Sequence, residues 1–250
     1  MKTFSLKIEQ KNFDLNFLGD ISTLNSPKIS IIGSRNCTQY TKNFVAEISS
    51  KLSKNGVKIV SGGAIGVDII AHKSATSANC ICVLPSGLDE LYPSINKKYL
   101  EEIAQNGLLV SQFANNFKAT NWSFVLRNEI VVALGNILIA AEAELKSGSM
   151  KSIEFALKQN KKIFVPLHRI GESSGTNYLL KNNLAEPIWD IDEFVQKFCG
   201  IKKTQIKDEF LLFCQKNPNY ENVFAFDSQK LFEYELLGKI KIENGKVLVI

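Results

Sequence analysis

The chain has 250 residues, of which 45% are hydrophobic and 22% charged, and these proportions exclude a fibrous or a disordered protein. Its 30 basic and 25 acidic residues give a net charge of +5, which permits a polyanionic partner without requiring one. No apolar run approaches the roughly 18 residues of a membrane span, and the start MKTFSLKIEQ is too polar for a signal peptide, so we expect a cytoplasmic protein with no membrane partner.

Short apolar runs alternate with amphipathic helical patterns from residue 28 onward, which is typical of consecutive βαβ units. The predicted strands are 28–33, 57–62, 80–85, 108–113, 137–143 and 162–167, with a short seventh strand near 187–189. The predicted helices lie near 40–54, 66–78, 94–105, 123–134, 149–160 and 192–198. This pattern predicts an α/β fold: a Rossmann-like, mostly parallel sheet with helices on both faces.

The domain organisation follows from the same pattern. Residues 1–27 are too few for a domain and are predicted to be a short N-terminal extension, and residues 28–200 to be the Rossmann-like domain. Residues 201–250 begin with a lysine-rich linker, continue with helices near 209–216 and 228–237, and end in a hairpin pattern about Glu243-Asn244-Gly245. We predict a small winged-helix-like C-terminal module. Its 8 lysines against 7 acidic residues favour protein contact over DNA contact.

Metal and acid–base sites have little support. The five cysteines are odd in number and lack CxxC pairing, and Cys80 and Cys82 alternate in an apolar run, so we expect core thiols rather than disulfides or a zinc site. Asp68 and His72 lie four residues apart, which is compatible with acid–base chemistry, but a helix-start carboxylate and a buried, hydrogen-bonded histidine are the favoured interpretation. We expect no catalytic residue, metal or cofactor.

Four glycine- and serine-rich loops follow predicted strands, at 33–36, 61–68, 146–149 and 175–177. In an open α/β sheet such loops meet at the carboxyl ends of the strands, where close backbone approach, hydroxyl groups and helix N-termini favour anions. Together with Arg35 and Lys146, they predict an anion-binding surface. GxGxxG and GxxxxGK[ST] are both absent, so NAD and ATP are not expected.

Arginine is rare here: Arg35, Arg127 and Arg169 are the only three among 30 basic residues, and all are predicted in loops or at helix ends. At such positions a planar guanidinium can form two parallel hydrogen bonds to a phosphate or a carboxylate. Arg127 belongs to the stretch KATNWSFVLRNEI, in which Trp122 and Phe124 have two open interpretations: a base-stacking groove or core anchors.

Taken in order, these segments resemble the DNA-processing protein A (DprA/Smf) family. The resemblance covers about residues 28–190 and is carried by IIGSRNCTQY, IVSGGAIGVDIIAH, VLPSGLDELYPSIN, SFVLRNEIVVAL, ILIAAEAELKSGSM and GTNYLLKNNLAEPI. It implies a non-enzymatic homodimer that binds and protects incoming single-stranded DNA and loads the RecA recombinase during natural transformation.

The resemblance also implies a DNA-binding surface on the Rossmann-like domain. The residues expected on it are Ser34, Arg35, Ser61, Gly62, Gly63, Gly66, Lys118, Arg127, Asn128, Lys146, Ser147, Gly148, Ser149, Thr176 and Asn177. The chain departs from the family at Ile65, where the family has arginine, and at Val125 and Glu129, where it has proline and a second arginine. With these positive charges missing, either DNA binds with fewer counterions released, or nearby lysines such as Lys118 and Lys146 replace the lost phosphate contacts.

Two alternatives stay open. One is a nucleotide-processing enzyme related to the cytokinin-activating phosphoribohydrolases, although their PGGxGT motif and catalytic glutamate are not matched here. The other is a protein-binding module that has lost its DNA pocket, which Ile65 and Glu129 would permit.

Overall fold

The computed structural model describes residues 2–8, 11–201 and 208–249, and the chain divides into two units, Met1–Ile201 and Lys202–Ile250. Nine strands of the first unit form one sheet in the order β1-β2-β6-β5-β4-β3-β7-β8-β9. Their bounds are β1 Lys2–Ile8, β2 Lys11–Gly19, β3 Lys28–Gly33, β4 Lys58–Ser61, β5 Cys80–Val83, β6 Leu108–Ser111, β7 Ile137–Glu142, β8 Ile163–Pro166 and β9 Glu186–Ile188. The seven strands β3 to β9 pair in parallel, whereas β1 and β2 add an antiparallel edge beyond β6.

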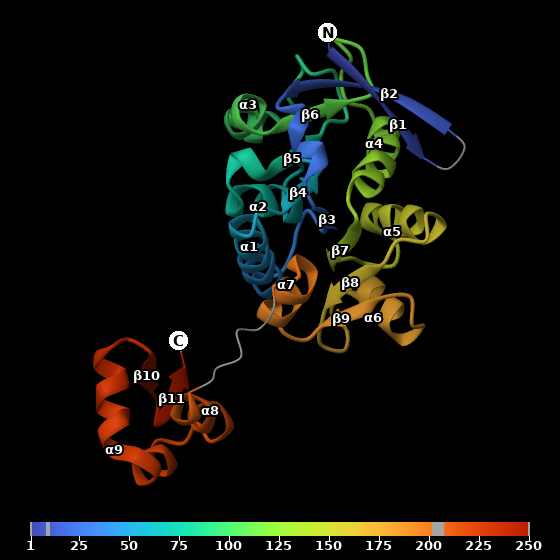
Figure 1. Cartoon of the computed structure of the whole chain (residues 1–250). Helices are drawn as coiled ribbons and strands as arrows, with labels where there is room; N and C mark the ends of the chain where they lie inside the picture. The colour runs from blue at the N-terminus through green and yellow to red at the C-terminus, as the bar shows by residue number, and fades with distance from the viewer. Residues whose placement is uncertain (1, 9–10, 202–207, 250) are drawn as a thin grey trace. The chain divides into compact units, whose positions relative to one another are not determined.

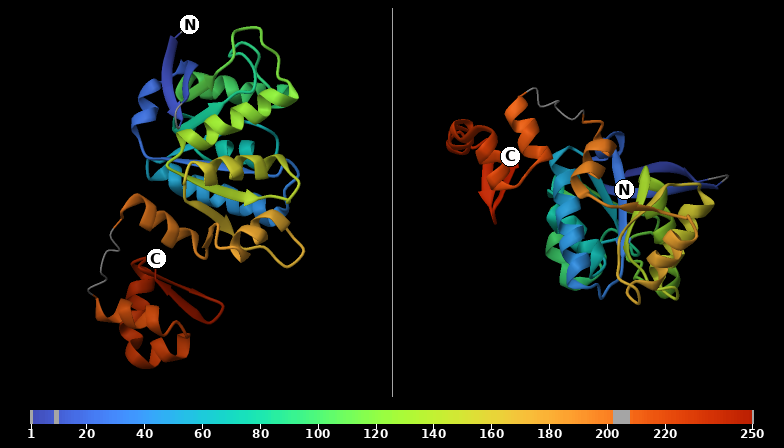
Figure 2. Two further views of the ribbon diagram at one scale, coloured as in Figure 1. Left: turned by 90° about the vertical axis from the view of Figure 1, so that its right-hand side faces the viewer. Right: turned by 90° about the horizontal axis from the view of Figure 1, so that it is seen from below.

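Helices cover both faces of this sheet (Figure 1). Their bounds are α1 Gln39–Lys54, α2 Val67–Ser74, α3 Lys97–Asn106, α4 Asn121–Leu134, α5 Gly148–Lys158, α6 Ser174–Lys181 and α7 Ile191–Cys199, with short 3-10 helices at Ile21–Asn25, Ser77–Asn79 and Ser94–Asn96. The blue and teal helices and the yellow-green helices lie on opposite sides of the strands in the right-hand view of Figure 2. The predicted Rossmann-like, mostly parallel α/β fold is therefore confirmed.

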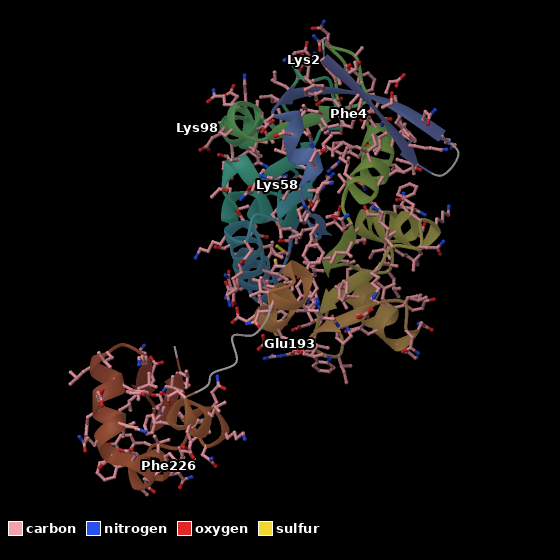
Figure 3. The ribbon with its side chains drawn as sticks, viewed as in Figure 1. Lys2, Phe4, Lys58, Lys98, Glu193 and Phe226 are labelled. Atoms are coloured by element: carbon pink, nitrogen blue, oxygen red, sulfur yellow. The ribbon has the colours of Figure 1, made fainter. Side chains whose placement is uncertain are left out.

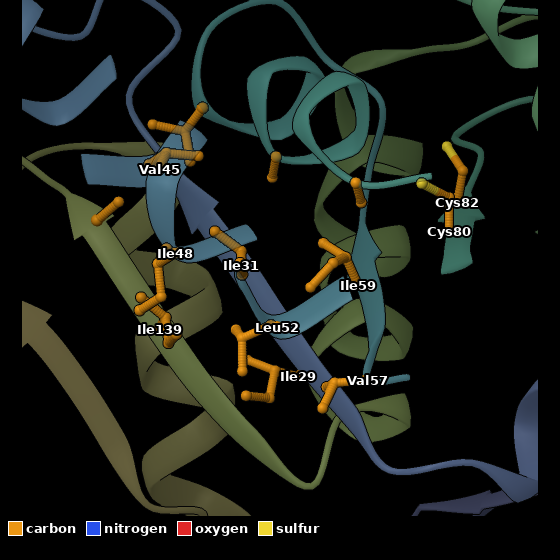
Figure 4. Close-up of a cluster of buried hydrophobic side chains, with 14 of the residues drawn as sticks. Ile29, Ile31, Val45, Ile48, Leu52, Val57, Ile59, Cys80, Cys82 and Ile139 are labelled. Atoms are coloured by element: carbon orange, nitrogen blue, oxygen red, sulfur yellow. The ribbon is translucent and has the colours of Figure 1, made fainter. Parts of the chain in front are cut away.

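The core has two layers because side chains alternate along each buried strand. Ile29 and Ile31 of β3 pack in one cluster with residues of α1, α2, α3 and α7, while Ile32 packs on the other face with residues of α4, α5 and α6. Cys80 and Cys82 belong to the first cluster, so they are core thiols as predicted (Figure 4). Such double-sided burial explains why these strands have continuous apolar sequences.

The first two strands were not predicted from the sequence. In β1 and β2, apolar residues occur at every second position. Phe4, which is labelled in Figure 3, packs edge-on against Phe17 with ring centroids 6.0 Å apart. Leu15 is fully buried in the second core layer. The N-terminal segment is thus not only an extension, because β2 pairs with β6 and covers that edge of the sheet.

The second unit has its own small core around Phe210, Val223 and Leu231. It contains α8 Glu209–Lys216, α9 Tyr220–Leu236, β10 Ile240–Glu243 and β11 Lys246–Val249. The predicted helix at 209–216 and the hairpin are both present. Helix α9 begins earlier than predicted because the Asn219 side chain caps it, and the prediction captured only the part after a kink at Asp227. The winged-helix-like assignment remains a prediction, and the predicted linker lies mostly outside the described residues.

Candidate functional site

The topology of the sheet determines where a ligand can bind. From β3 the chain proceeds outward to β4, β5 and β6, and then returns to place β7 on the other side of β3. Such a reversal leaves a crevice outside the carboxyl ends of the two central strands. A cavity of about 490 Å³ lies there, lined by residues that follow β3 and β7 and by residues of α4 and α5. Seven predicted site residues line it: Ser34, Arg35, Arg127, Asn128, Ser147, Gly148 and Ser149.

Arg35 contributes the most accessible cation of the predicted set to this cavity. It is exposed in the loop after β3, and its guanidinium carbon lies 5.1 Å from the centre of the Phe124 ring, which also lines the cavity. No salt bridge within the described residues involves Arg35. A guanidinium placed over an aromatic face and left without a carboxylate partner is available for an anionic ligand.

Gly66 packs closely against the backbone of the loop that carries Arg35. Its φ is +83°, and a Cβ atom there would lie 2.3 Å from the Ser34 carbonyl oxygen and 2.6 Å from Arg35 Cα. Only glycine permits both this conformation and this approach of the two loops. Gly66 is not among the cavity-lining residues, and its position supports the loop that carries Arg35.

The N-terminus of α5 forms another part of the cavity wall. Ser147 is its N-cap, and its hydroxyl accepts a hydrogen bond from the Met150 N–H at 3.3 Å. The amides of Gly148 and Ser149 belong to the first turn, where backbone N–H groups have no intrahelical acceptor and the helix dipole favours anions. Lys151 also lines the cavity, 3.0 Å from Glu154. The sequence analysis missed it, although its place in the first turn after the 146–149 loop was a usable signal.

Arg127 lies in the middle of α4 rather than at a helix end, which corrects the prediction. Its Nη1 is 3.4 Å from Asp68 Oδ2, and the two side chains are only 5% and 10% exposed. Burial raises the pKa of Asp68, while the guanidinium of Arg127 and the N–H of Gly62, which donates to Oδ2 at 3.2 Å, act in the opposite direction. Arg127 Nε is buried without a hydrogen-bond acceptor. The Arg127–Asp68 pair is therefore a buried floor of the cavity.

The second glycine-rich loop, at 61–68, makes most of its contacts within the protein rather than with the cavity. Ser61 is buried and its hydroxyl donates to the Ile31 carbonyl at 2.6 Å, and the Gly63 carbonyl accepts from the Asn96 side chain at 3.0 Å. A Cβ atom at Gly62 would lie 0.8 Å from Arg127 Nη1. Only Ala64 and Asp68 of the 61–68 segment line the cavity. The structure thus gives Ser61, Gly62 and Gly63 scaffold positions.

The fourth predicted loop is part of helix α6. Thr176 is buried, and its hydroxyl donates to the backbone carbonyl of Ser173 at 3.0 Å. The Asn177 amide donates to the carbonyls of Arg169 and Glu172. Neither residue lines the cavity. Lys118 and Lys146 are exposed but are also absent from the cavity wall.

Asp68 lines the cavity but His72 does not, so the two residues do not present an acid–base pair to it. His72 is fully buried, and burial lowers its pKa to about 4, so the ring is neutral near pH 7. Within the described residues neither ring nitrogen forms a hydrogen bond of normal geometry, although the Ser61 backbone is close enough to oppose part of the fall in the His72 pKa; the buried histidine that was expected is therefore present. No cluster of three or more metal-ligating side chains occurs in the described part of the chain, and no helix described there is long and apolar enough to cross a membrane.

Comparison with known proteins identifies similar chains. The family model described as DNA recombination-mediator protein A matches residues 4–199. A solved structure that describes the single-stranded DNA binding mode of DNA processing protein A from Helicobacter pylori is 38% identical, with a TM-score of 0.76, and the match covers 81% of this chain and 98% of that one.

Two curated relatives extend the comparison. DNA processing protein DprA of Streptococcus pneumoniae is 32% identical over 171 residues, which are 67% of this chain and 60% of the relative. Protein Smf of Synechocystis is 36% identical over 140 residues, which are 55% of this chain and 35% of the relative. The chain therefore spans between about a third and three fifths of the length of these relatives.

Proposed function

Because the chain belongs to the DNA recombination-mediator protein A family, we propose that its cavity at the β3/β7 switch point binds the phosphate backbone of single-stranded DNA. The observation that carries this proposal is the Arg35 guanidinium, which has no carboxylate partner among the described residues and lies in the same cavity as the N-terminus of α5. Both features favour anions and neither reads a base sequence, so binding is expected to be independent of sequence.

The positively charged side chains that line the cavity differ in whether they have a carboxylate partner. Arg127 is paired with Asp68, and Lys151 lies beside Glu154, whereas Arg35 has no carboxylate partner among the described residues. The Glu144 carboxylate, also in the wall, accepts hydrogen bonds from the backbone and hydroxyl of Ser174. Arg35 is therefore the principal phosphate contact, and Gly148 and Ser149 supply backbone donors.

The phosphate contact is tested by fluorescence anisotropy of a labelled oligo-dT. We expect saturable binding that unlabelled single strands displace better than duplex DNA, and an affinity about tenfold lower in Arg35→Ala, since one charge-assisted contact is lost. Arg169→Ala is the matched control, because Arg169 is exposed and is not in the cavity wall.

One outcome of this experiment would contradict the proposal. If wild type does not bind the oligonucleotide at low salt, the proposal is wrong. Release of free base from a nucleoside monophosphate would then point to the phosphoribohydrolase alternative.

The finer functions follow from the family alone. We propose that the protein acts as a homodimer, without catalytic activity, and transfers the bound strand to a RecA recombinase during natural transformation. The family description as a recombination mediator supports this proposal. Faster assembly of recombinase filaments on strands coated with a single-strand-binding protein would be the supporting result, and sedimentation would test the dimer.

A further inference from the structure

A large aromatic side chain lies exposed at the start of α4. Trp122 is 54% exposed, yet its ring is held edge-on by Phe113 and Phe117, with centroid distances of 5.6 and 5.5 Å. Those two phenylalanine rings stack on each other at 4.4 Å. The indole is therefore fixed on one side and free on the other, so stacking a ligand on it costs little side-chain entropy.

This aromatic group continues the surface of the cavity. Val125, one helical turn after Trp122, lines the cavity, as does Asn121, which precedes it. Residues three apart lie on the same side of a helix, so Trp122 and Val125 are neighbours. The indole therefore adjoins the cavity wall at the N-terminal end of α4.

The charge beside the indole suits a nucleic acid. Lys118 directly follows Phe117, is exposed, and forms no salt bridge within the described residues. It was predicted as a DNA contact but does not line the cavity. Because it follows Phe117 directly, Lys118 places a positive charge outside the cavity, next in sequence to the aromatic group.

We propose that Trp122 and Lys118 form a second binding station for single-stranded DNA, where one base stacks on the indole and a neighbouring phosphate pairs with the lysine. This inference rests on the proposed function, because the strand must first occupy the cavity. Val125 and Leu126 beside the indole are also partly exposed and would suit a protein surface. The unpaired cation and the continuity with the cavity favour nucleic acid.

The test compares two oligo-dT lengths: about four nucleotides, at the lower limit of typical single-strand sites, and about twelve nucleotides, well within their range. All variants are full-length and carry Trp189→Phe, so that Trp122 is the only source of tryptophan fluorescence. We expect the longer strand to quench this fluorescence. Trp122→Leu should weaken binding of the longer strand about 5- to 100-fold and change binding of the shorter strand less than about twofold. Trp122→Phe should bind the longer strand more tightly than Trp122→Leu does, because a phenyl ring can still stack on a base.

The outcomes separate the two proposals. Arg35→Ala should weaken both lengths, whereas Trp122→Leu should affect only the longer one. If Arg35→Ala weakens binding but Trp122→Leu leaves both affinities unchanged, the second station is refuted, the cavity stands, and the exposed strip is a protein surface. Equal losses for both lengths in a folded Trp122→Leu variant would also refute it. Absence of binding by wild type would overturn both.

Discussion

Gly62 leaves the space that the side chain of Arg127 occupies. Its N–H donates to Asp68, and the space where its Cβ would be is occupied by the Arg127 guanidinium. Alanine at position 62 can therefore be accommodated only if Arg127 leaves the buried carboxylate. Gly62→Ala should lower the free energy of unfolding by at least about 2 kcal/mol, because a buried charge pair is separated.

A matched glycine is available as the control for chemical denaturation. A Cβ at Gly148 meets nothing within 4 Å. Gly148→Ala should leave the free energy of unfolding within about 0.5 kcal/mol of wild type, or slightly above it, because alanine suits a helix. Equal effects of the two substitutions would contradict the packing described for Arg127.

His72 makes stability depend on pH. Its pKa is about 4 in the folded protein, whereas an exposed histidine titrates near 6.5. Above pH 6.5 the ring is neutral in both the folded and the unfolded state. As the pH falls toward 4, the unfolded chain gains the proton while the folded protein largely does not, so the free energy of unfolding falls by roughly 3 kcal/mol. Urea unfolding across this range should show that His72→Leu removes most of the loss. An unchanged pH dependence in the variant would mean that His72 is not buried as a neutral ring.

The sequence predicted residues whose chemistry is local and missed contacts made at long range. Arg35 and Ser147 to Ser149 lie in the loops after β3 and β7 or at the start of the helix that follows, so strand ends and loop composition were enough to place them in one crevice. The partner of Arg127 is Asp68, 59 residues away, and no local pattern indicates that pairing. Burial of Arg127 could therefore not be predicted.

Among the elements, α6 was missed because Ser, Gly, Thr and Asn are typical of loops. The helix begins at Ser174 after Ser173, which has a φ of +46°, and the Gly175 N–H donates to the Ala143 carbonyl at 2.7 Å. This tertiary contact overrides weak local propensity. Strand β1 does have a signal in its sequence, the alternation of Phe4, Leu6 and Ile8 with polar residues.

The N-terminal strand pair tests how an added edge stabilises the sheet. Leu15 of β2 is fully buried, whereas Leu18 of the same strand is 49% exposed. Leu15→Ala should lower the free energy of unfolding by about 2–5 kcal/mol through lost burial and a residual cavity. Leu18→Ala should change it by no more than about 0.5 kcal/mol. Similar losses in denaturant unfolding would show that β2 does not pack as described.

For the whole molecule, the match of the family model to residues 4–199 confirmed the family resemblance. The α/β fold was predictable because regular alternation of strands and helices constrains topology strongly. The edge formed by β1 and β2 could not be anticipated from the βαβ pattern alone. We propose that the units Met1–Ile201 and Lys202–Ile250 are separate domains, since each has its own hydrophobic core.

The measurement that tests the central claim most directly is the salt dependence of oligo-dT binding by wild type, Arg35→Ala and Arg169→Ala. Each phosphate contact to a single strand contributes about 0.7 to the slope of log affinity against log salt concentration. We predict that Arg35→Ala reduces the slope by about that amount and that Arg169→Ala does not. Identical slopes for wild type and Arg35→Ala would contradict a phosphate contact at Arg35, and with it the assignment of the cavity.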